Sequence, residues 1–213
     1  MRPTMFVVMV EMPTEINLRN LYFELIHEYS VKALAPGSLG QRVVNVHEWV
    51  IGSIEAKVLD TSVLVFPNGK IKVSGGSTGY NKDSGAYENW LETHKVLPVL
   101  RVLFPGAEQS VSLKISLING SHTLPGVNML NFFDICNLLE DEKNFIVSKP
   151  SMLVNPGKRG RICSVSVKTH KTKGSLRFDH SGKLQLFGFK SYSDMEMMLG
   201  NLETHLKKTT MIE

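Results

Sequence analysis

The chain of 213 residues has little cysteine and no long hydrophobic run. Its two cysteines, Cys136 and Cys163, are too few for a disulfide framework or a four-thiolate metal site. No stretch approaches the roughly 18 consecutive apolar residues that a membrane-spanning helix needs. Residues 1–10 lack the basic start, long apolar centre and small-residue cleavage site of a secretory signal. These absences predict a soluble protein of a reducing, intracellular compartment that does not contact a membrane.

Catalytic motifs are missing as well. The sequence contains no G-x-S-x-G, no G-x-x-x-x-G-K-[ST], no G-x-G-x-x-G and no H-E-x-x-H. The glycine-rich stretch 75–79 lacks the lysine that a phosphate-binding loop needs, and the seven histidines show no metal-ligand spacing. We therefore expect no enzyme, no metal and no cofactor. A helix-covered β protein with an enzymatic cleft is the least favoured interpretation.

Acidic residues are absent from one long segment. Between Lys143 and Arg177 there are nine basic residues and no Asp or Glu. Residues 1–106 hold ten basic and ten acidic residues, so residues 107–213, with fourteen and ten, carry the whole net charge of +4. Such a segment creates a positive field that favours an anionic partner. A solvated surface loop is the alternative interpretation.

What the chain does contain is an internal repeat. The stretch Phe66–Gly75 has Gly-Lys, an apolar–polar–apolar triplet, one further residue and Gly, and the stretch His180–Gly188 repeats this order. The offset from Gly69 to Gly182 is 113 residues, and Leu-Glu-Thr-His also occurs once in each half. The Leu-Glu-Thr-His offset is 111 residues, so the order is the same and the offsets are nearly equal, as expected for duplication. We predict two pseudo-repeats that together form one domain, residues 1–106 and 107–213.

Hydrophobic periodicity predicts the same elements in both halves. Each half should open with a strand, at 6–10 and 111–118, and continue with a helix. The apolar faces of these helices are Leu18, Leu21, Tyr22, Leu25 and Tyr29 in the first half and Met129, Phe132, Phe133, Cys136 and Leu139 in the second. Sheet-forming stretches follow, from about 43 to 74 and from 163 to 187, with hairpin turns at Asn68-Gly69 and Ser181-Gly182.

A helix should close each half. The first passes through Tyr87, Trp90, Leu91 and His94, and Pro98 kinks or ends it. The second starts at a capping box of Ser193 and Glu196. Its apolar face holds Met195, Met198, Leu199, Leu202 and Leu206. The expected fold class is α+β, in the order β-α-β-β-β(-β)-α twice, with one curved antiparallel sheet and four helices on one face.

Strand alternation assigns residues to the two faces of this sheet. Val63, Val65, Ile71 and Val73 should lie under the helices, as should Leu184 and Leu186. The opposite, open face should carry Leu64, Phe66, Lys70, Lys72 and Ser74 in the first half and Lys183, Gln185 and Phe187 in the second. Cations among apolar side chains suit a nucleic-acid surface, because cations meet phosphates while apolar groups contact sugars or bases. A protein partner or a missing layer of structure would also suit such a face.

This pattern resembles the TATA-box-binding protein family. Leu64, Phe66, Gly69, Lys70, Ser74 and Gly75 match the hairpin of that family, and Trp49, 17 residues before Phe66, matches its other first-half wedge position. For a lone aromatic, a place in the core is the alternative. The segment Val154–Ile162 is also similar to one in divergent TATA-binding-like proteins of large nucleocytoplasmic DNA viruses.

The resemblance implies a saddle-shaped sheet that binds the minor groove of duplex DNA and kinks it with aromatic wedges. It also implies a monomer that recruits a transcription factor IIB-like protein and RNA polymerase through its helices. The expected location is the nucleus or a cytoplasmic viral factory. The candidate DNA-binding residues are Phe66, Trp49, Leu64, Lys70, Lys72, Ser74, Val7, Lys114, Lys183, Gln185, Phe187, Phe178, Lys158, Arg159 and Arg161.

Several positions depart from the family pattern. Met5 and Lys114 stand where the family has asparagines, and Glu55 stands where it has an arginine. Asp179 occupies a second-half wedge position, with Phe178 shifted by one residue. We therefore expect DNA binding with altered or weak sequence preference. The alternative is a scaffold of the same fold that binds proteins and has lost DNA binding.

Overall fold

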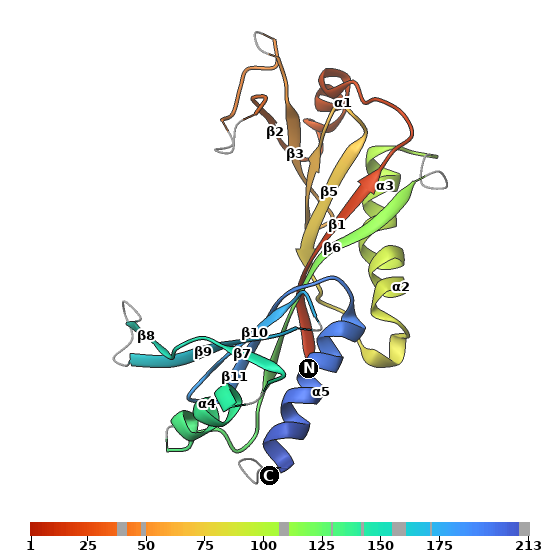
Figure 1. Ribbon diagram of the computed structural model, residues 1–213. Coiled ribbons are helices and arrows are strands. Elements are labelled where there is room, and N and C mark those ends of the chain that lie inside the picture. The colour runs from red at the N-terminus through yellow and green to blue at the C-terminus, as the bar shows by residue number, and fades with distance from the viewer. Residues whose placement is uncertain are drawn as a thin grey trace. The chain divides into compact units, whose positions relative to one another are not determined.

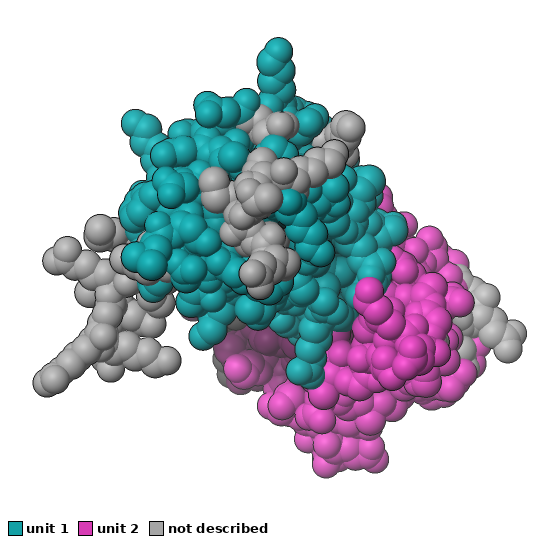
Figure 2. Space-filling view, turned by 90° about the horizontal axis from the view of Figure 1, so that it is seen from below, with its two compact units in different colours: residues 1–4, 117–213 teal, residues 5–116 magenta. Residues whose placement is uncertain are grey.

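The computed structural model describes residues 1–37, 42–47, 50–106, 111–128, 130–141, 143–154, 161–170 and 172–208. Within these ranges the side chains of residues 84, 152–154, 161–162 and 208 are outside the description. The chain forms two compact units (Figure 2): unit 1 comprises residues 1–4 and 117–213, and unit 2 comprises residues 5–116. The predicted division into pseudo-repeats concerns sequence similarity and stays a prediction.

Figure 1 shows the elements along the chain. Within the described residues the first half follows the predicted order, whereas the second half has five strands between its two helices where three or four were predicted. The first half contains β1 (Arg2–Glu11), α1 (Leu18–Leu25), β2 (Ser30–Leu34), β3 (Ser53–Val58), β4 (Thr61–Val65), β5 (Lys70–Gly76), the 3-10 turn η1 (Lys82–Ser84), α2 (Tyr87–Leu91), the π-helical turn η2 (Glu92–Val96) and α3 (Leu97–Leu103). The second half contains β6 (Ser112–Thr123), α4 (Phe132–Asp141), β7 (Phe145–Val147), β8 (Ser151–Val154), β9 (Arg161–Thr169), β10 (Ser175–Asp179), β11 (Lys183–Phe189) and α5 (Tyr192–Lys208).

Within the described residues, the strands form one large antiparallel sheet. The strand order is β2-β3-β4-β5-β1-β6-β11-β10-β9-β7, and β8 pairs with β9. Strands β2 to β5 belong to unit 2 and β7 to β11 to unit 1, whereas β1 and β6 contribute residues to both units. The predicted α+β class, with one antiparallel sheet and four helical segments, is confirmed at this level.

The core of unit 2 follows from alternation along three neighbouring strands. Val8, Val73 and Val63 lie opposite one another on β1, β5 and β4 and are buried, as is the next row of Val10, Ile71 and Val65. Leu91 and Val96 of the α2–η2 helix line a small cavity with Val8, Leu113 and Ile115. This face of the sheet is therefore the helix-covered one, as predicted, and the opposite face is open.

Unit 1 has a core of the same kind. Leu176, Leu184 and Leu186 are buried on the helix-covered face, together with the α5 residues Met195, Met198, Leu199, Leu202 and Leu206. The predicted apolar face of this last helix is thus confirmed. Helix α4 packs on the same side, because the ring of Phe132 meets the ring of Phe178 edge to face at a centroid distance of 5.7 Å.

The two predicted hairpin turns have matching backbone geometry. Gly69 and Gly182 adopt φ of +80° and +75°, which favours glycine. A Cβ at Gly69 would lie 2.7 Å from the Thr14 oxygen, and one at Gly182 would lie 2.5 Å from the Leu124 oxygen. The glycine carbonyls accept hydrogen bonds from the N–H of Met12 (2.9 Å) and of Leu124 (2.8 Å). Both turns are therefore fixed against the end of a neighbouring strand.

Four local predictions need correction. Helix α1 ends at Leu25, and Ser30–Leu34 forms strand β2, which was not predicted. On α4, Phe133 is 46% exposed because it lies next to, not on, the buried face. Helix α5 begins at Tyr192, and its cap is Ser191, whose Oγ accepts from the Asp194 N–H at 3.1 Å.

Pro98, which was predicted to kink or end the last helix of the first half, does not end it. It lies in the first turn of α3, where its missing N–H leaves no intrahelical bond unmade. The π-helical turn η2 immediately precedes it. A wider turn avoids the clash between a proline ring and the carbonyl four residues earlier, so the helix continues to Leu103.

The hairpin between β3 and β4 turns at Leu59 and Asp60, which both have positive φ (47° and 60°). This is a type I′ turn, for which Asn-Gly is preferred, whereas leucine in the left-handed region costs about 1–2 kcal/mol. Leu59→Asn with Asp60→Gly is therefore expected to raise the free energy of unfolding by about 1–2 kcal/mol, measured by urea unfolding. Leu59→Ala, which keeps the strain, should give no such gain. A double variant no more stable than this control would contradict the assignment.

Candidate nucleic-acid interface

The open face of unit 2 brings most first-half candidates together. β5 contributes a polar column of Lys70, Lys72 and Ser74. Cross-strand pairing places Val7 opposite Ser74, and places Lys72 between Met9 on β1 and Leu64 on β4. The Phe66 N–H donates to the Lys70 carbonyl at 2.9 Å, so this half-buried aromatic residue follows Leu64 at the end of β4. The result is a cationic, hydroxylated column between two largely apolar ones, which also include Glu11 opposite Lys70 on β1 and Ser62 opposite Ser74 on β4.

Lys114 extends this face on β6. Its neighbours Leu113 and Ile115 line the cavity on the helix side, so alternation places the exposed Lys114 on the open side. Met5, at one of the two positions where the resemblance implies an asparagine, is exposed at the start of the unit 2 portion of β1. The open face of unit 2 therefore offers cations and apolar groups, but no amide at these two positions.

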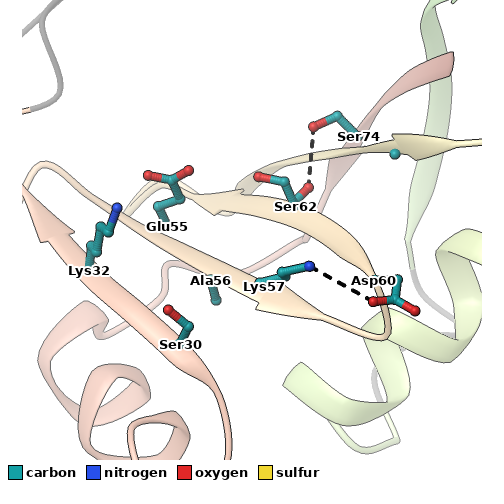
Figure 3. A pocket seen from close by; sticks show the side chains of 9 residues that line it. Ser30, Lys32, Glu55, Ala56, Lys57, Asp60, Ser62 and Ser74 are labelled. Atoms are coloured by element: carbon teal, nitrogen blue, oxygen red, sulfur yellow. Dashed lines mark hydrogen bonds and ion pairs between the residues drawn. The ribbon is translucent and has the colours of Figure 1, made fainter.

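Carboxylates accompany the outer lysines of unit 2. A hollow of about 360 Å³ on β2 to β5 contains Lys32, Glu55, Lys57 and Asp60 (Figure 3). Lys57 Nζ lies 3.9 Å from Asp60, and Glu55 pairs directly across the strands with Lys32. At the other end, Lys70 Nζ lies 4.0 Å from Glu11. These exposed pairs are weak, but they lower the local positive potential that an anion would meet.

The open face of unit 1 is formed by β6, β11, β10 and β9. Lys183, Gln185 and Phe187 are exposed on β11, as predicted. Gln185 pairs with Ser121 on one side and with Arg177 on the other, and Ser175 pairs with Lys168. Arg177 and Lys168 are therefore part of the candidate interface, although sequence reasoning counted them only as members of a basic segment. The sequence did contain a signal for the place of Arg177. It alternates with Leu176 and Phe178 on one strand, and since these two are buried, Arg177 lies on the open face.

Arg177 is held in a defined orientation. Its Nε and Nη2 donate to the Ser164 Oγ at 3.0 and 2.6 Å. Ser164 is buried although it lies on the open side of β9 opposite Asp179, and its Oγ contacts both the Arg177 guanidinium and the Ser151 Oγ of β8 (3.5 Å). Arginine has five N–H donors, so most of them remain free to bind an anion above the sheet.

Phe178 does not lie on the open face. Its side chain is 0% exposed and packs beneath α4, with Val165 and Leu184 as its cross-strand neighbours. The predicted wedge role for Phe178 is therefore wrong in this conformation. Asp179 explains the arrangement: its Oδ1 accepts from the backbone N–H of Ser181 (2.8 Å) and of Lys183 (3.2 Å) and fixes the turn. At the second-half wedge position, where the resemblance implies an aromatic residue, the chain therefore has Asp179, which fixes the β10–β11 turn.

Some candidates cannot be placed. Trp49, Lys158 and Arg159 lie outside the described residues. Arg161 begins β9, but its side chain is also outside the description. Their roles stay predictions, as does the similarity of the segment 154–162 to viral proteins.

Groups suited to other chemistry are few in the described part of the chain. No cluster of three or more His, Cys, Asp or Glu side chains that could hold a metal ion occurs there. Cys136 and Cys163 are buried and free, and burial raises the pKa of the Cys136 thiol to about 12. This thiol stays protonated at neutral pH and is a poor nucleophile. No described helix has both the length and the apolar character to cross a bilayer.

Comparison with solved structures establishes the fold. The chain is similar to the Methanococcus jannaschii TBP, with a TM-score of 0.56 and 12% sequence identity over 97% of this chain and 98% of that chain. A rolling circle replication initiator protein from Geobacillus stearothermophilus matches with a TM-score of 0.41, 9% identity and coverage of 95% and 79%, which does not establish a common fold. No family model and no curated protein matches the sequence. The chain therefore has a TBP-like fold.

Proposed function

We propose that the protein binds duplex DNA through the open face of its sheet and acts as a non-enzymatic, TATA-binding-like transcription initiation factor. The observation that carries the proposal is the column of Lys70, Lys72 and Ser74, in which Lys72 lies between Met9 of β1 and Leu64 of β4 and Ser74 lies opposite Val7. Lysines can neutralise phosphates while the apolar groups and Phe66 contact sugars and base edges in a minor groove. The TBP-like fold supports the same assignment.

The recurring turn geometry at Gly69 and Gly182 supports a repeated, saddle-like architecture. Such an architecture would present two similar surfaces to the two halves of a DNA site. The surfaces differ chemically, because Phe66 has no exposed counterpart at Phe178 and Arg177 adds charge in unit 1. We therefore propose weak sequence preference and a smaller bend at the unit 1 end. Action as a monomer, in the nucleus or a viral factory, is part of the proposal.

Helix α4 supports recruitment of a protein partner. Leu130 is 91% exposed immediately before this helix, and Phe133 is 46% exposed in its first turn. Asn128 fixes this presentation, because its Oδ1 accepts from the Leu130 N–H at 2.9 Å. Asp134, Glu140 and Asp141 are the exposed charged side chains of α4. An apolar and acidic helix face suits a basic protein partner such as a transcription factor IIB-like protein, and it does not suit DNA.

Fluorescence anisotropy tests the proposal directly. A labelled TATA-containing duplex and a scrambled GC-rich duplex would each be titrated over a range of salt concentrations. Binding to both with a steep salt dependence, and a small preference for TATA, is the expected result. Absence of binding at low salt would reject DNA binding. It would favour the protein-interaction scaffold, for which the carboxylates beside Lys32, Lys57 and Lys70 are the supporting observation.

Phe66→Ala is expected to weaken duplex binding by about ten- to a hundredfold, on the scale of 1–3 kcal/mol for an aromatic contact with a base. Affinity would be measured by anisotropy, and bending by energy transfer between dyes at the duplex ends. The control is Phe23→Ala, which removes an exposed aromatic residue from α1 and leaves β1, β4 and β5 unchanged. Equal affinity and bending in the Phe66→Ala and wild-type proteins would remove Phe66 from the interface.

Glu55→Lys is expected to tighten DNA binding. The substitution removes a carboxylate from the open face and places a third cation beside Lys32 and Lys57. One additional phosphate contact should steepen the slope of log affinity against log salt by about 0.9. Glu92→Lys, an equal charge change at an exposed position on η2, is the matched control. If both variants bind DNA equally tightly, the gain reflects net charge and Glu55 does not face DNA.

A further inference from the structure

Unit 1 contains a second hollow on its sheet, separate from the Phe66 surface of unit 2. It has a volume of about 630 Å³ and lies where β1, β6 and β11 run side by side. Its lining residues are Met1, Arg2, Ser121, His122, Thr123, Lys183, Leu184 and Gln185. All of these lining residues belong to unit 1, and all lie within the described part of the chain.

The lining of this hollow is rich in hydrogen-bond donors and contains no carboxylate. Arg2 and Lys183 bring positive charges from the two strands that flank β6. Ser121 and Thr123 bring hydroxyls from β6, and Gln185 brings an amide. Cross-strand pairing fixes the spacing, because Lys183 lies opposite Thr123 and Gln185 lies opposite Ser121.

The nearby acids already have partners. Glu203 on α5 receives a 2.8 Å contact from the Nε2 of His122, and Asp179 accepts hydrogen bonds in the adjacent turn. Within the described part of the chain, Arg2 and Lys183 form no ion pair. This differs from Lys57 and Lys70 of unit 2, which lie within 4.0 Å of a carboxylate.

We propose that this hollow binds a phosphate group. Two unpaired cations, two hydroxyls and an amide can surround a tetrahedral anion that accepts at several oxygens, and the arginine fork matches two phosphate oxygens at once. The same chemistry fits a backbone phosphate of duplex DNA and a free polyphosphate. If the phosphate belongs to duplex DNA, the inference rests on the proposed function, because the hollow would then hold one strand of the duplex against β11.

Inorganic pyrophosphate is the probe that tests the hollow without DNA. Two-dimensional amide NMR of the full chain would be recorded during a pyrophosphate titration at constant ionic strength. Saturable shifts at Ser121, Thr123, Lys183 and Gln185 are expected. Arg2→Gln and Lys183→Gln should each weaken binding by about tenfold, the scale of one charge-assisted hydrogen bond. Lys207→Gln, an exposed lysine on α5, is the matched control and should bind as the wild type does.

Both substituted side chains lie in the open hollow, so a normal thermal melt is expected for every variant and would be checked first. Shifts that grow linearly without saturation would overturn the proposal. Equal weakening in Lys207→Gln would also overturn it, since binding would then follow net charge alone.

A DNA arm separates the two phosphate sources and separates this inference from the proposed function. If a short duplex displaces pyrophosphate from the four amides, the hollow binds a backbone phosphate. If pyrophosphate binds but the duplex does not, the proposed function fails and the hollow is a polyphosphate site. If the duplex binds without moving these amides and pyrophosphate does not saturate, the inference fails and DNA binding stands.

Discussion

Replacing Phe178 with alanine is expected to lower the free energy of unfolding by about 3–5 kcal/mol. The ring is fully buried, meets Phe132 of α4 edge to face and lies between Val165 and Leu184 on the neighbouring strands. Truncation removes its contacts and leaves a cavity under α4, which a sheet with neighbours on both sides cannot close. Urea unfolding followed by circular dichroism measures the change.

The matched control is Phe187→Ala, on the next strand of the same sheet. Phe187 is 38% exposed, so the expected loss is below about 1 kcal/mol. The sequence resemblance placed Phe178 beside a wedge position, and the two variants decide between core and interface. DNA binding by Phe178→Ala would be measured at a temperature where the variant is folded. A variant of wild-type stability that has lost DNA affinity would return Phe178 to the interface.

Alternation and turn residues carried most of the sequence prediction. Val63, Val65, Ile71 and Val73 recur at every second position, and two lysines alternate with them on β5, so the covered and open faces of the β4–β5 hairpin could be assigned before the structure was known. Asn68-Gly69 marked the turn, because glycine adopts the positive φ required there. The long apolar face of α5 was equally clear, since its methionines and leucines recur at helical spacing.

The remaining features depend on tertiary contacts that periodicity does not encode. Strand β2 has only five residues and forms by pairing with β3, which lies many residues later in the sequence. The Leu59–Asp60 turn carries no glycine or asparagine signal, so the pairing of β3 with β4 imposes it. Phe178 alternates with Arg177 and Asp179 on β10 and therefore lies on the core side, while the Asp179 carboxylate fixes the following turn by accepting from the Ser181 N–H.

The candidate site was predictable only in part for a related reason. Lys183 and Gln185 follow from the alternation of one strand. Arg177 required knowledge of which strand lies beside β11, because its place in the interface comes from pairing with Gln185. Its orientation comes from Ser164 on a third strand. Cross-strand neighbours of this kind are set by topology, and a single sequence does not specify them.

Arg177→Gln combined with Lys183→Gln is expected to have the largest effect on DNA binding. Both side chains lie on the open face of unit 1, on adjacent strands. If each contacts one phosphate, the slope of log affinity against log salt should fall by about 1.8, and affinity at low salt should fall by about a hundredfold or more. Anisotropy with the TATA-containing and GC-rich duplexes at several salt concentrations measures both quantities. The loss should be the same for the two sequences, because phosphate contacts carry no base information.

Lys143→Gln combined with Lys207→Gln gives the same change in net charge in the same unit. Both residues are exposed and lie off the sheet, after α4 and on α5. This control should shift affinity only slightly, through the long-range field, and leave the salt slope nearly unchanged. If the two double variants lose affinity and slope equally, the protein attracts DNA by net charge and its sheet is not the contact surface. A loss confined to the Arg177→Gln and Lys183→Gln double variant would assign the phosphate contacts of unit 1 to β10 and β11, where the hydrogen bond to Ser164 orients the Arg177 guanidinium.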